Sequence, residues 1–359
     1  MVDSKQAPLD SAAAAKAAFA SVQDKPFPDD IFTAPELRWA VIGCGVIANQ
    51  IAQSLALAGR KLAGVANRTL SKAQAFAEQY GIEKVYESVE DLYADPGIDA
   101  VYITTPHNTH ITYLRDALAA GKHVLCEKAI TLNSAELDEA RAIADEHNVV
   151  LMDATTVLHM PLYQELRRRM DAGEFGRMNL AQLNFGSYKE YGDLTNRFYN
   201  RNLAGGAMLD IGVYALSVMR LFMASQPIEV VSLGNTCETG VDVAGGIVCR
   251  NAEQQLGVVS LTLHSKQPKR SIISFDKCYI EVNEYPRADH ATIVWTADGH
   301  REEVHAGTEA YALCYEMADL EKAVAGDDSK RELLDYASDV MELMTKLRAD
   351  WGVVYPEEE

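Results

Sequence analysis

The sequence predicts an α/β protein with an N-terminal doubly wound parallel sheet and a C-terminal α+β domain whose open sheet is largely antiparallel. Short apolar runs alternate with amphipathic helical stretches from Leu37 to about Met152. Further candidate strands are grouped together after about residue 178. The chain has 359 residues, of which 48% are hydrophobic, and this is enough for two packed cores.

Residues 1–34 are expected to form an N-terminal arm. A run of alanines at 12–15 is followed by Lys25-Pro26-Phe27-Pro28, whose prolines end any helix before them. The sequence leaves open whether this arm is an accessory element or a partly ordered tail without a role in chemistry.

Residues 35–154 are expected to form a dinucleotide-binding domain around the parallel sheet. The expected strands are 37–42, 62–66, 100–104, 124–126 and 149–152, and the expected helices are 46–58, 71–80, 110–120 and 135–147. Strands that alternate with helices are joined by crossovers, and such connections favour a parallel sheet covered on both faces.

Residues 155–359 are expected to form a domain for substrate binding and dimerisation. A helix to about residue 172 precedes the expected strands 178–185, 228–235, 242–249, 255–263, 271–275, 278–282 and 291–296. Further helices are expected at about 208–223, 310–324 and 330–351. Because the strands are grouped and not interleaved with helices, we expect a largely antiparallel sheet with helices on one face.

Charge and cysteine usage narrow the class of protein. The net charge is −19, which repels phosphate backbones and anionic lipids, so neither nucleic acid nor membrane is expected as a partner. The six cysteines are scattered without metal-ligand spacing, so no metal site is expected. Without a recognisable signal peptide or membrane-spanning run, the protein is expected to be cytoplasmic.

The segment Gly43-Cys44-Gly45-Val46-Ile47-Ala48 follows the first expected strand and opens a helix, which is the setting of a Rossmann dinucleotide fingerprint. Gly43 permits the tight turn, Gly45 leaves room for the pyrophosphate, and Ala48 allows close packing of helix on strand. We therefore expect Gly43, Gly45, Val46 and Ile47 to bind the cofactor at the positive helix end.

The second expected strand ends in Ala66-Asn67-Arg68-Thr69, where an NAD site would usually carry a carboxylate for the ribose. Arg68 offers a guanidinium to a 2′-phosphate, and Lys72 is a further possible donor. NADP(H) is therefore favoured. The alternative is that Arg68 is a solvated residue at the helix start and that NAD(H) is bound through Asn67.

The strand ending at Thr104 leads into the polar loop Thr105-Pro106-His107-Asn108-Thr109-His110, at the edge where open α/β sheets bind ligands. We expect Thr105, Pro106, His107, Asn108 and His110 near the nicotinamide half of the cofactor. Either histidine could equally be a helix-start residue without a ligand.

Glu127 and Lys128 close another strand in the same row, so both are expected at the cofactor, where the Lys128 cation could polarise an oxygen. Downstream, Gly205 to Tyr214 introduces an apolar helix that carries Asp210 and Tyr214 four residues apart on one face. We expect Lys128, Asp210 and Tyr214 to form the catalytic group. Without Lys128 and the cofactor site, a capping aspartate and a core tyrosine would be the better interpretation.

From about Leu37 to Pro356 the sequence resembles the Gfo/Idh/MocA oxidoreductase family. The resemblance rests on several motifs in the expected order: the Gly43 fingerprint, Thr105-Pro106-His107, Glu127-Lys128, Gly205 to Tyr214, Tyr315-Glu316-Met317 and Gly352-Val353-Val354-Tyr355-Pro356. Tyr214 stands where many members have histidine, and this resembles the branch of dimeric dihydrodiol dehydrogenase and NADP-dependent D-xylose dehydrogenase. Ala129 stands where proline is common, so the loop that carries Lys128 is expected to be less rigid.

The resemblance implies hydride exchange between nicotinamide C4 and the carbinol carbon of a sugar, polyol or cyclic diol, with Tyr214 moving the hydroxyl proton. Lys128 would lower the pKa of the tyrosine and Asp210 would orient both. It also implies a homodimer, or a higher homo-oligomer, formed face to face through the open sheet. The alternatives are a cofactor-sensing regulatory protein without turnover and a redox-neutral NAD-dependent glycosidase.

Substrate contacts are the least determined part of the site. Polar and aromatic candidates flank the catalytic helix, namely Tyr188, Arg197, Asn200, Asn202 and His159. No spacing in this region singles out one of them.

Overall fold

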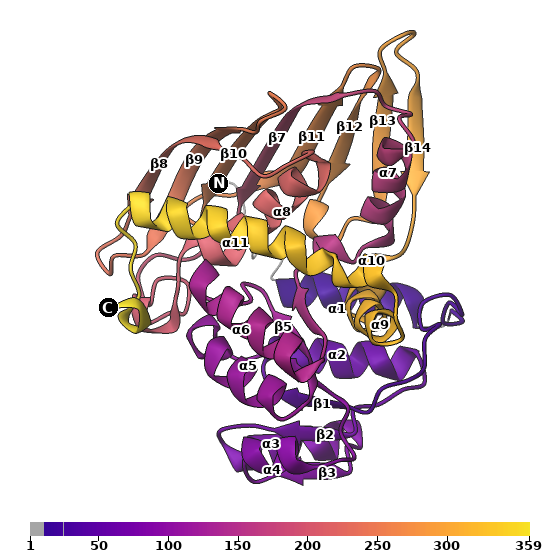
Figure 1. Cartoon of the computed structure of the whole chain (residues 1–359), viewed down its shortest axis with the longest axis vertical. Coiled ribbons are helices and arrows are strands. Elements are labelled where there is room, and N and C mark those ends of the chain that lie inside the picture. Colours follow the sequence, from indigo (N-terminus) through magenta and orange to yellow (C-terminus); the bar gives the residue numbers. More distant parts are fainter. Residues whose placement is uncertain (1–10, 24) are drawn as a thin grey trace, which may run out of the picture.

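The computed structural model describes residues 11–23 and 25–359. Two sheets lie one above the other in Figure 1, with the first sheet and its helices in indigo and purple and the second sheet in magenta to orange. This confirms the predicted combination of a parallel and a largely antiparallel sheet.

The first sheet has six strands in the order β3-β2-β1-β4-β5-β6, and every neighbouring pair is parallel. Its strands are β1 Trp39–Ile42, β2 Gly64–Ala66, β3 Lys84–Tyr86, β4 Ala100–Ile103, β5 His123–Glu127 and β6 Leu151–Ala154. The order reverses between β1 and β4, so their carboxyl ends flank the point where doubly wound sheets bind ligands.

Helices connect these strands and cover both faces of the sheet. They are α2 Val46–Leu57, α3 Leu70–Tyr80, α4 Val89–Ala94, α5 His110–Ala119 and α6 Ser134–His147. The sequence did not predict β3 and α4, because both are short and β3 is only partly buried.

One helix of the first sheet's core comes from far along the chain. Helix α9, Ala312–Val324, places Leu313, Met317 and Leu320 in the same apolar cluster as Trp39 on β1. From the sequence alone, this segment was assigned to the second domain, because the residues of a helix do not show which sheet the helix covers. The division at residues 34 and 154 stays a prediction.

The second sheet has eight strands in the order β14-β13-β12-β11-β7-β10-β9-β8. They are β7 Met178–Gly186, β8 Glu229–Thr236, β9 Asp242–Arg250, β10 Leu256–Thr262, β11 Gln267–Phe275, β12 Cys278–Asn283, β13 His290–Trp295 and β14 Arg301–His305. Only β7 and β10 pair in parallel. Strand β14 was not predicted, because its sequence is mostly charged and carries no apolar strand pattern.

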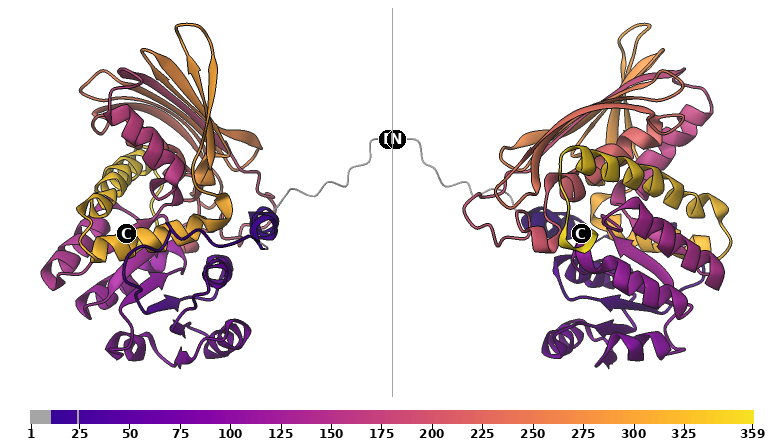
Figure 2. Two further views of the ribbon diagram at one scale, coloured as in Figure 1. Left: turned by 90° about the vertical axis from the view of Figure 1, so that its right-hand side faces the viewer. Right: turned by 60° about the vertical axis from the view of Figure 1, so that its left-hand side comes forward.

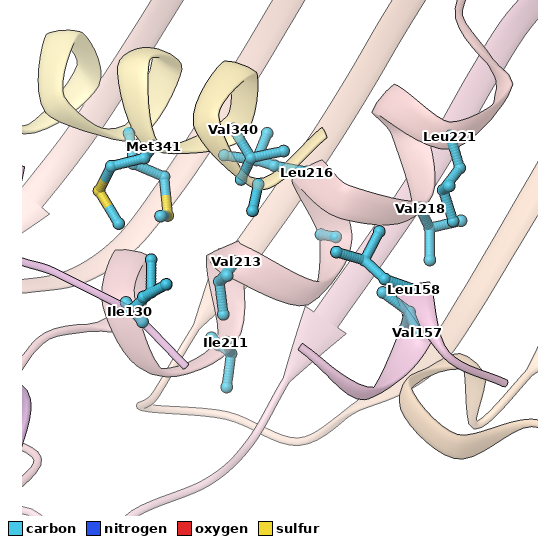
Figure 3. Packing of buried hydrophobic residues seen from close by; sticks show 14 of the residues in the cluster. Ile130, Val157, Leu158, Ile211, Val213, Leu216, Val218, Leu221, Val340 and Met341 are labelled. Atoms are coloured by element: carbon cyan, nitrogen blue, oxygen red, sulfur yellow. The ribbon is translucent and has the colours of Figure 1, made fainter. Parts of the chain in front are cut away.

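Helices α7 Pro161–Asp171, α8 Val213–Phe222, α10 Asp328–Arg331 and α11 Leu333–Asp350 complete the second part of the fold. Figure 1 shows α7, α8 and α11 on one side of the second sheet. Figure 3 shows the core at α8, where Val213 and Leu216 lie close to Val340 and Met341 of α11. In Figure 2 no helix from the described residues covers the other face of the sheet.

The described part of the N-terminal arm packs on the fold. Its helix α1, Ser11–Val22, ends at a buried valine, and Ile31 is also buried. The rings of Phe27 and Tyr311 meet edge to face with centroids 5.0 Å apart. These contacts favour a structural role over a loose tail for this part of the arm.

One apolar helical stretch, Arg201–Phe222, is long enough to cross a membrane by length and composition, but 83% of its apolar window is buried inside the protein. This stretch contains α8 and forms part of the core.

Candidate active site

The turn after β1 fits a bound dinucleotide. Gly43 has φ +104°, and a Cβ there would lie 2.8 Å from Thr104 Oγ1, so this tight turn requires glycine. Gly45 precedes α2 without a side-chain cap, and a Cβ on it would meet no atom within 4 Å. The first-turn amides at Val46 and Ile47 therefore begin a helix beside open space, which suits a pyrophosphate.

The end of β2 places cationic side chains at the surface. Arg68 and Lys72 are both exposed, and Asn67 donates from Nδ2 to the Thr69 carbonyl at 3.0 Å. The Asn67 amide therefore shapes its own turn, while the two cations remain accessible to an anionic ligand.

The loop after β4 is fixed by contacts with the second part of the chain. His107 Nδ1 lies 3.3 Å from the Ala204 carbonyl, and burial lowers the pKa of His107 to about 3. Asn108 donates from Nδ2 to the Asn202 carbonyl at 3.2 Å and to Glu357 Oε1 at 2.7 Å. These two side chains thus hold the loop against the segment that leads to α8.

His110 was predicted beside the cofactor, and the structure corrects this. Its side chain is fully buried, with Nε2 2.8 Å from the Thr105 carbonyl and Nδ1 3.0 Å from the Ala129 carbonyl. It joins two loops from inside the protein. The loop after Lys128, in which the Lys128–Ala129 peptide bond is cis, is therefore in contact with His110, and Ala129 is buried. The lower rigidity expected from the missing proline stays a prediction.

Lys128 follows β5 directly and reaches the other two predicted catalytic residues. Its Nζ donates to the Asp210 carbonyl at 2.6 Å and to Asp210 Oδ1 at 3.2 Å. The same ammonium lies 4.8 Å from the centre of the Tyr214 ring. An ammonium has three N–H donors, and the third has no acceptor among the described residues.

The segment that carries Asp210 and Tyr214 is shaped by its glycines. Gly206 has φ +128°, and a Cβ there would lie 2.3 Å from Oδ1 of the buried Asp242, whose Oδ2 accepts from the Met208 amide at 2.6 Å. A π-helical turn, Met208–Gly212, then precedes α8, where one continuous α-helix was predicted. Such turns frequently occur at functional sites.

The charges of the site support one another. Burial would lower the pKa of Lys128, but Asp210, Tyr214 and Glu127 together outweigh it and raise that pKa, so the lysine is an ammonium. Burial would raise the pKa of Asp210, but Lys128 and Arg197 lower it. Burial raises the pKa of the Tyr214 phenol, and Lys128 opposes this rise. Lys128 therefore acts on the phenol in the predicted direction, although burial outweighs it.

The sequence matches two family descriptions. Residues 37–155 match the family described as an oxidoreductase family with an NAD-binding Rossmann fold, GFO_IDH_MocA, and residues 163–281 match the GFO/IDH/MocA C-terminal domain. A mouse trans-1,2-dihydrobenzene-1,2-diol dehydrogenase is 32% identical over 254 residues, which cover 69% of this chain and 75% of the relative. The chain belongs to the Gfo/Idh/MocA oxidoreductase family.

Other relatives of this Gfo/Idh/MocA protein have similar names or folds. A pig trans-1,2-dihydrobenzene-1,2-diol dehydrogenase is 28% identical over 90% of this chain and 99% of its own length. An aldose-aldose oxidoreductase from Caulobacter crescentus has a TM-score of 0.77 at 21% identity, over 88% of this chain and 98% of its own. A 3-ketoreductase from Actinomadura kijaniata, solved with NADP and TDP-benzene, has a TM-score of 0.75 at 24% identity and the same coverage. These two structures show the shared fold.

Of the predicted substrate contacts of this Gfo/Idh/MocA protein, only Arg197 is shown beside the catalytic group. Its NH2 lies 3.3 Å from Asp210 Oδ1, and the side chain is 57% exposed. Tyr188 is exposed, and Asn202 is an exposed neighbour of the Asn108 loop. The Asn200 side chain accepts from the Asn202 amide and donates to the Thr195 carbonyl, so it shapes its own turn.

His159 was also predicted as a substrate contact, and this is wrong. It is 1% exposed, with Nδ1 3.1 Å from Asp319 Oδ2 and Nε2 2.8 Å from the Asp153 carbonyl. Both nitrogens therefore have protein partners in the interior, and the side chain joins the segment before α7 to α9.

Sequence reasoning missed two groups beside Glu127. Tyr102 on β4 donates toward Glu127 Oε1 at 2.9 Å. Burial raises the pKa values of Glu127 and Tyr214, and the nearby Arg287 opposes both rises. A tyrosine inside an apolar strand looks like any core residue, and an arginine in a loop looks solvated, so neither gave a signal.

Proposed function

We propose that this protein transfers a hydride between NADP(H) and the CH–OH carbon of a sugar, polyol or cyclic diol. The observation that carries this is the Lys128 ammonium, which contacts Asp210 and lies over the Tyr214 ring at the carboxyl edge of the Rossmann sheet. The names of the diol dehydrogenase and aldose oxidoreductase relatives support the substrate class.

Each residue has a distinct task in this proposal. The bound dinucleotide would supply the nicotinamide carbon that takes or gives the hydride. Tyr214 accepts the hydroxyl proton during oxidation and returns it during reduction, and Lys128 stabilises the negative charge that develops on the phenol or the substrate oxygen. Asp210 holds Lys128 in place as an ammonium.

The direct test is the change in nicotinamide absorbance with NADP or NAD against a panel of aldoses, polyols and cyclic diols. A variant that lacks the Lys128 amine serves as the blank. Turnover that is absent from the blank and that releases free reduced cofactor supports the proposal. Demonstrated cofactor binding without turnover, or cofactor recycling without net release, would favour the sensor or the glycosidase instead.

Gly45→Val should separate cofactor binding from folding. Gly45 has φ −80° and open space at its Cβ, so the variant is expected to fold with an unchanged Tm. The branched side chain would occupy the approach of the pyrophosphate and weaken cofactor binding about 10-fold or more. Calorimetric titration with NADPH measures this. Gly246→Ala, also with an open Cβ, is the control, and an unchanged Kd in Gly45→Val would exclude this turn as the cofactor site.

Arg68→Ala is expected to weaken NADPH binding about 10-fold and NADH binding by less than about twofold. The reason is that a guanidinium can bind the 2′-phosphate with two hydrogen bonds, and NADH lacks that phosphate. Dissociation constants for both cofactors check the result, with Lys61→Ala as a surface-cation control. Equal losses for both would remove the case for NADP.

We further propose that the uncovered face of the second sheet binds a second copy of the chain. Apolar side chains gather there in register, because Val231 of β8 pairs with Val248 of β9. Large side chains on this face are exposed to an unusual degree, Val231 at 76% and Leu233 at 83%. Such a patch marks an interface, and a symmetric copy would present the same patch.

Leu233→Lys is expected to shift the sedimenting species to a monomer, because it would place two like charges in a dry interface. Analytical ultracentrifugation at micromolar concentration is the measurement. Lys346→Leu, on α11, is a control for a general change in surface charge. A dimer that survives in Leu233→Lys would place the interface elsewhere.

A further inference from the structure

Behind the catalytic lysine, one tyrosine hydroxyl lies between two buried carboxyl groups. Tyr102 Oη is 2.9 Å from Glu127 Oε1 and 2.7 Å from Glu316 Oε2. Tyr102 and Glu316 are fully buried, and Glu127 is partly buried directly before Lys128. The three residues come from β4, β5 and α9, so this trio joins the first sheet to the helix from the far end of the chain.

Both short contacts cannot be made by two ionised carboxylates. A tyrosine hydroxyl has one hydrogen to donate, and an ionised carboxylate can only accept. If Tyr102 donates to one glutamate, the other must donate to Tyr102 Oη, and it therefore carries a proton. The geometry thus requires one proton shared by the trio beyond that of the tyrosine.

Two observations place this proton on Glu316. Glu127 precedes the Lys128 ammonium, which favours its ionised form, whereas the charged neighbour of Glu316 within the trio is Glu127 itself. In addition, Glu316 Oε1 is buried without a hydrogen-bond partner among the described residues. A neutral carbonyl oxygen tolerates this far better than a charged carboxylate oxygen does.

We propose that Glu316 is a positioning residue that carries the shared proton and, through Tyr102, holds Glu127 as the single carboxylate behind Lys128. The hydrogen bonds then run in one direction, from Glu316 to Tyr102 to Glu127. The link to catalysis rests on the proposed function, but the protonation state does not.

Loss of the Glu316 proton would make the trio more negative. Burial, together with the charge of Glu127, raises the pKa of Glu316 to about 7. The groups that face Glu316 are Tyr102 from β4, Glu127 from β5, and Thr156 and His159 from the segment before α7. The Thr156 hydroxyl and the positive form of His159 both oppose the rise. Above this pH a second buried carboxylate would compete for Tyr102 and add negative charge to the trio. The Glu127 charge already raises the pKa of the Tyr214 phenol, and the added charge is expected to raise it further.

Infrared difference spectroscopy of the purified chain tests the protonation directly. At pH 6 the C=O absorption of protonated carboxyls is expected to be larger in the wild type than in Glu316→Gln, whose amide can still donate to Tyr102, by the contribution of one carboxyl. The absorption that remains in the variant comes from other buried carboxyls, because burial also raises the pKa of Asp153 to about 7 and that of Asp242 to about 6. Glu342→Gln, at an exposed site on α11, should leave the band unchanged. In Tyr102→Phe the band should remain but shift, because the carboxyl loses its acceptor. A band of equal intensity in wild type and Glu316→Gln would overturn the proposal.

The pH profile of kcat tests the positioning role once a substrate is known. In the direction of alcohol oxidation, where Tyr214 must accept a proton, the ratio of wild-type to Glu316→Gln kcat should be near one at pH 6. It should fall about 10-fold by pH 9 if the added charge raises the Tyr214 pKa by about one unit. A ratio that is constant with pH would overturn the positioning role. Failure to find any substrate would count against the proposed function, while the infrared result would still decide the protonation.

Discussion

Lys128→Met is expected to lower kcat about 10³-fold or more while changing the Kd for NADPH by less than about threefold. The methionine keeps the length of the side chain but removes the ammonium that donates to Asp210 and lies over the Tyr214 ring. Without this charge, the negative charge that develops on oxygen during proton transfer loses its nearest stabilising group. Steady-state kinetics and calorimetric titration together separate the two effects.

The same variant needs a check on folding, because it removes a partner from the buried Asp210 carboxylate. Arg197 Nη2 still lies 3.3 Å from Asp210 Oδ1, so the buried carboxylate keeps one positively charged partner. Thermal unfolding and circular dichroism show whether the fold persists. Lys61→Met removes an exposed lysine paired with Glu83 and should keep full activity. If a folded Lys128→Met retained wild-type kcat, the assigned role of Lys128 would be wrong.

The local sequence pattern was sufficient to predict those helices and strands whose own residues carry the hydrophobic signal. The alternation of apolar runs and helices predicted the strand β1, the fingerprint turn at Gly43 and most strands of the second sheet, since each strand carries its own hydrophobic signal. The grouping of Lys128, Asp210 and Tyr214 was also predicted, and the structure brings all three together. Their catalytic roles stay predictions.

Features that depend on packing between distant segments could not be predicted from the sequence. The destination of α9 could not be predicted, because its apolar face fits either sheet equally well in sequence. His110 and His159 looked like ligand-binding residues because polar side chains in loops are normally exposed. Both are buried, however, and form hydrogen bonds with segments distant in sequence. Glu316 belongs to a motif shared with the family, but no role for it followed from the sequence. Its contact with Tyr102 suggests a role.

Tyr214→Phe is expected to lower kcat about 10² to 10⁴-fold with little change in cofactor affinity, because it removes the proton donor and keeps the ring. The ring should stay in place, since Phe185 packs beside it with centroids 6.1 Å apart. The activity that remains should also lose its dependence on the phenol, so the pH profile of kcat flattens on the side where the phenol is protonated.

The double variant of Lys128→Met and Tyr214→Phe decides whether the two residues act together. If Lys128 acts mainly on the tyrosine oxygen, the double variant should be hardly slower than Tyr214→Phe alone, because groups that act as a unit are far from additive. Tyr336→Phe, on α11 and away from the proposed interface, controls for the loss of a hydroxyl. Fully additive losses would mean that Lys128 acts on the substrate independently of Tyr214, and an active Tyr214→Phe would move the proton-transfer role to another group.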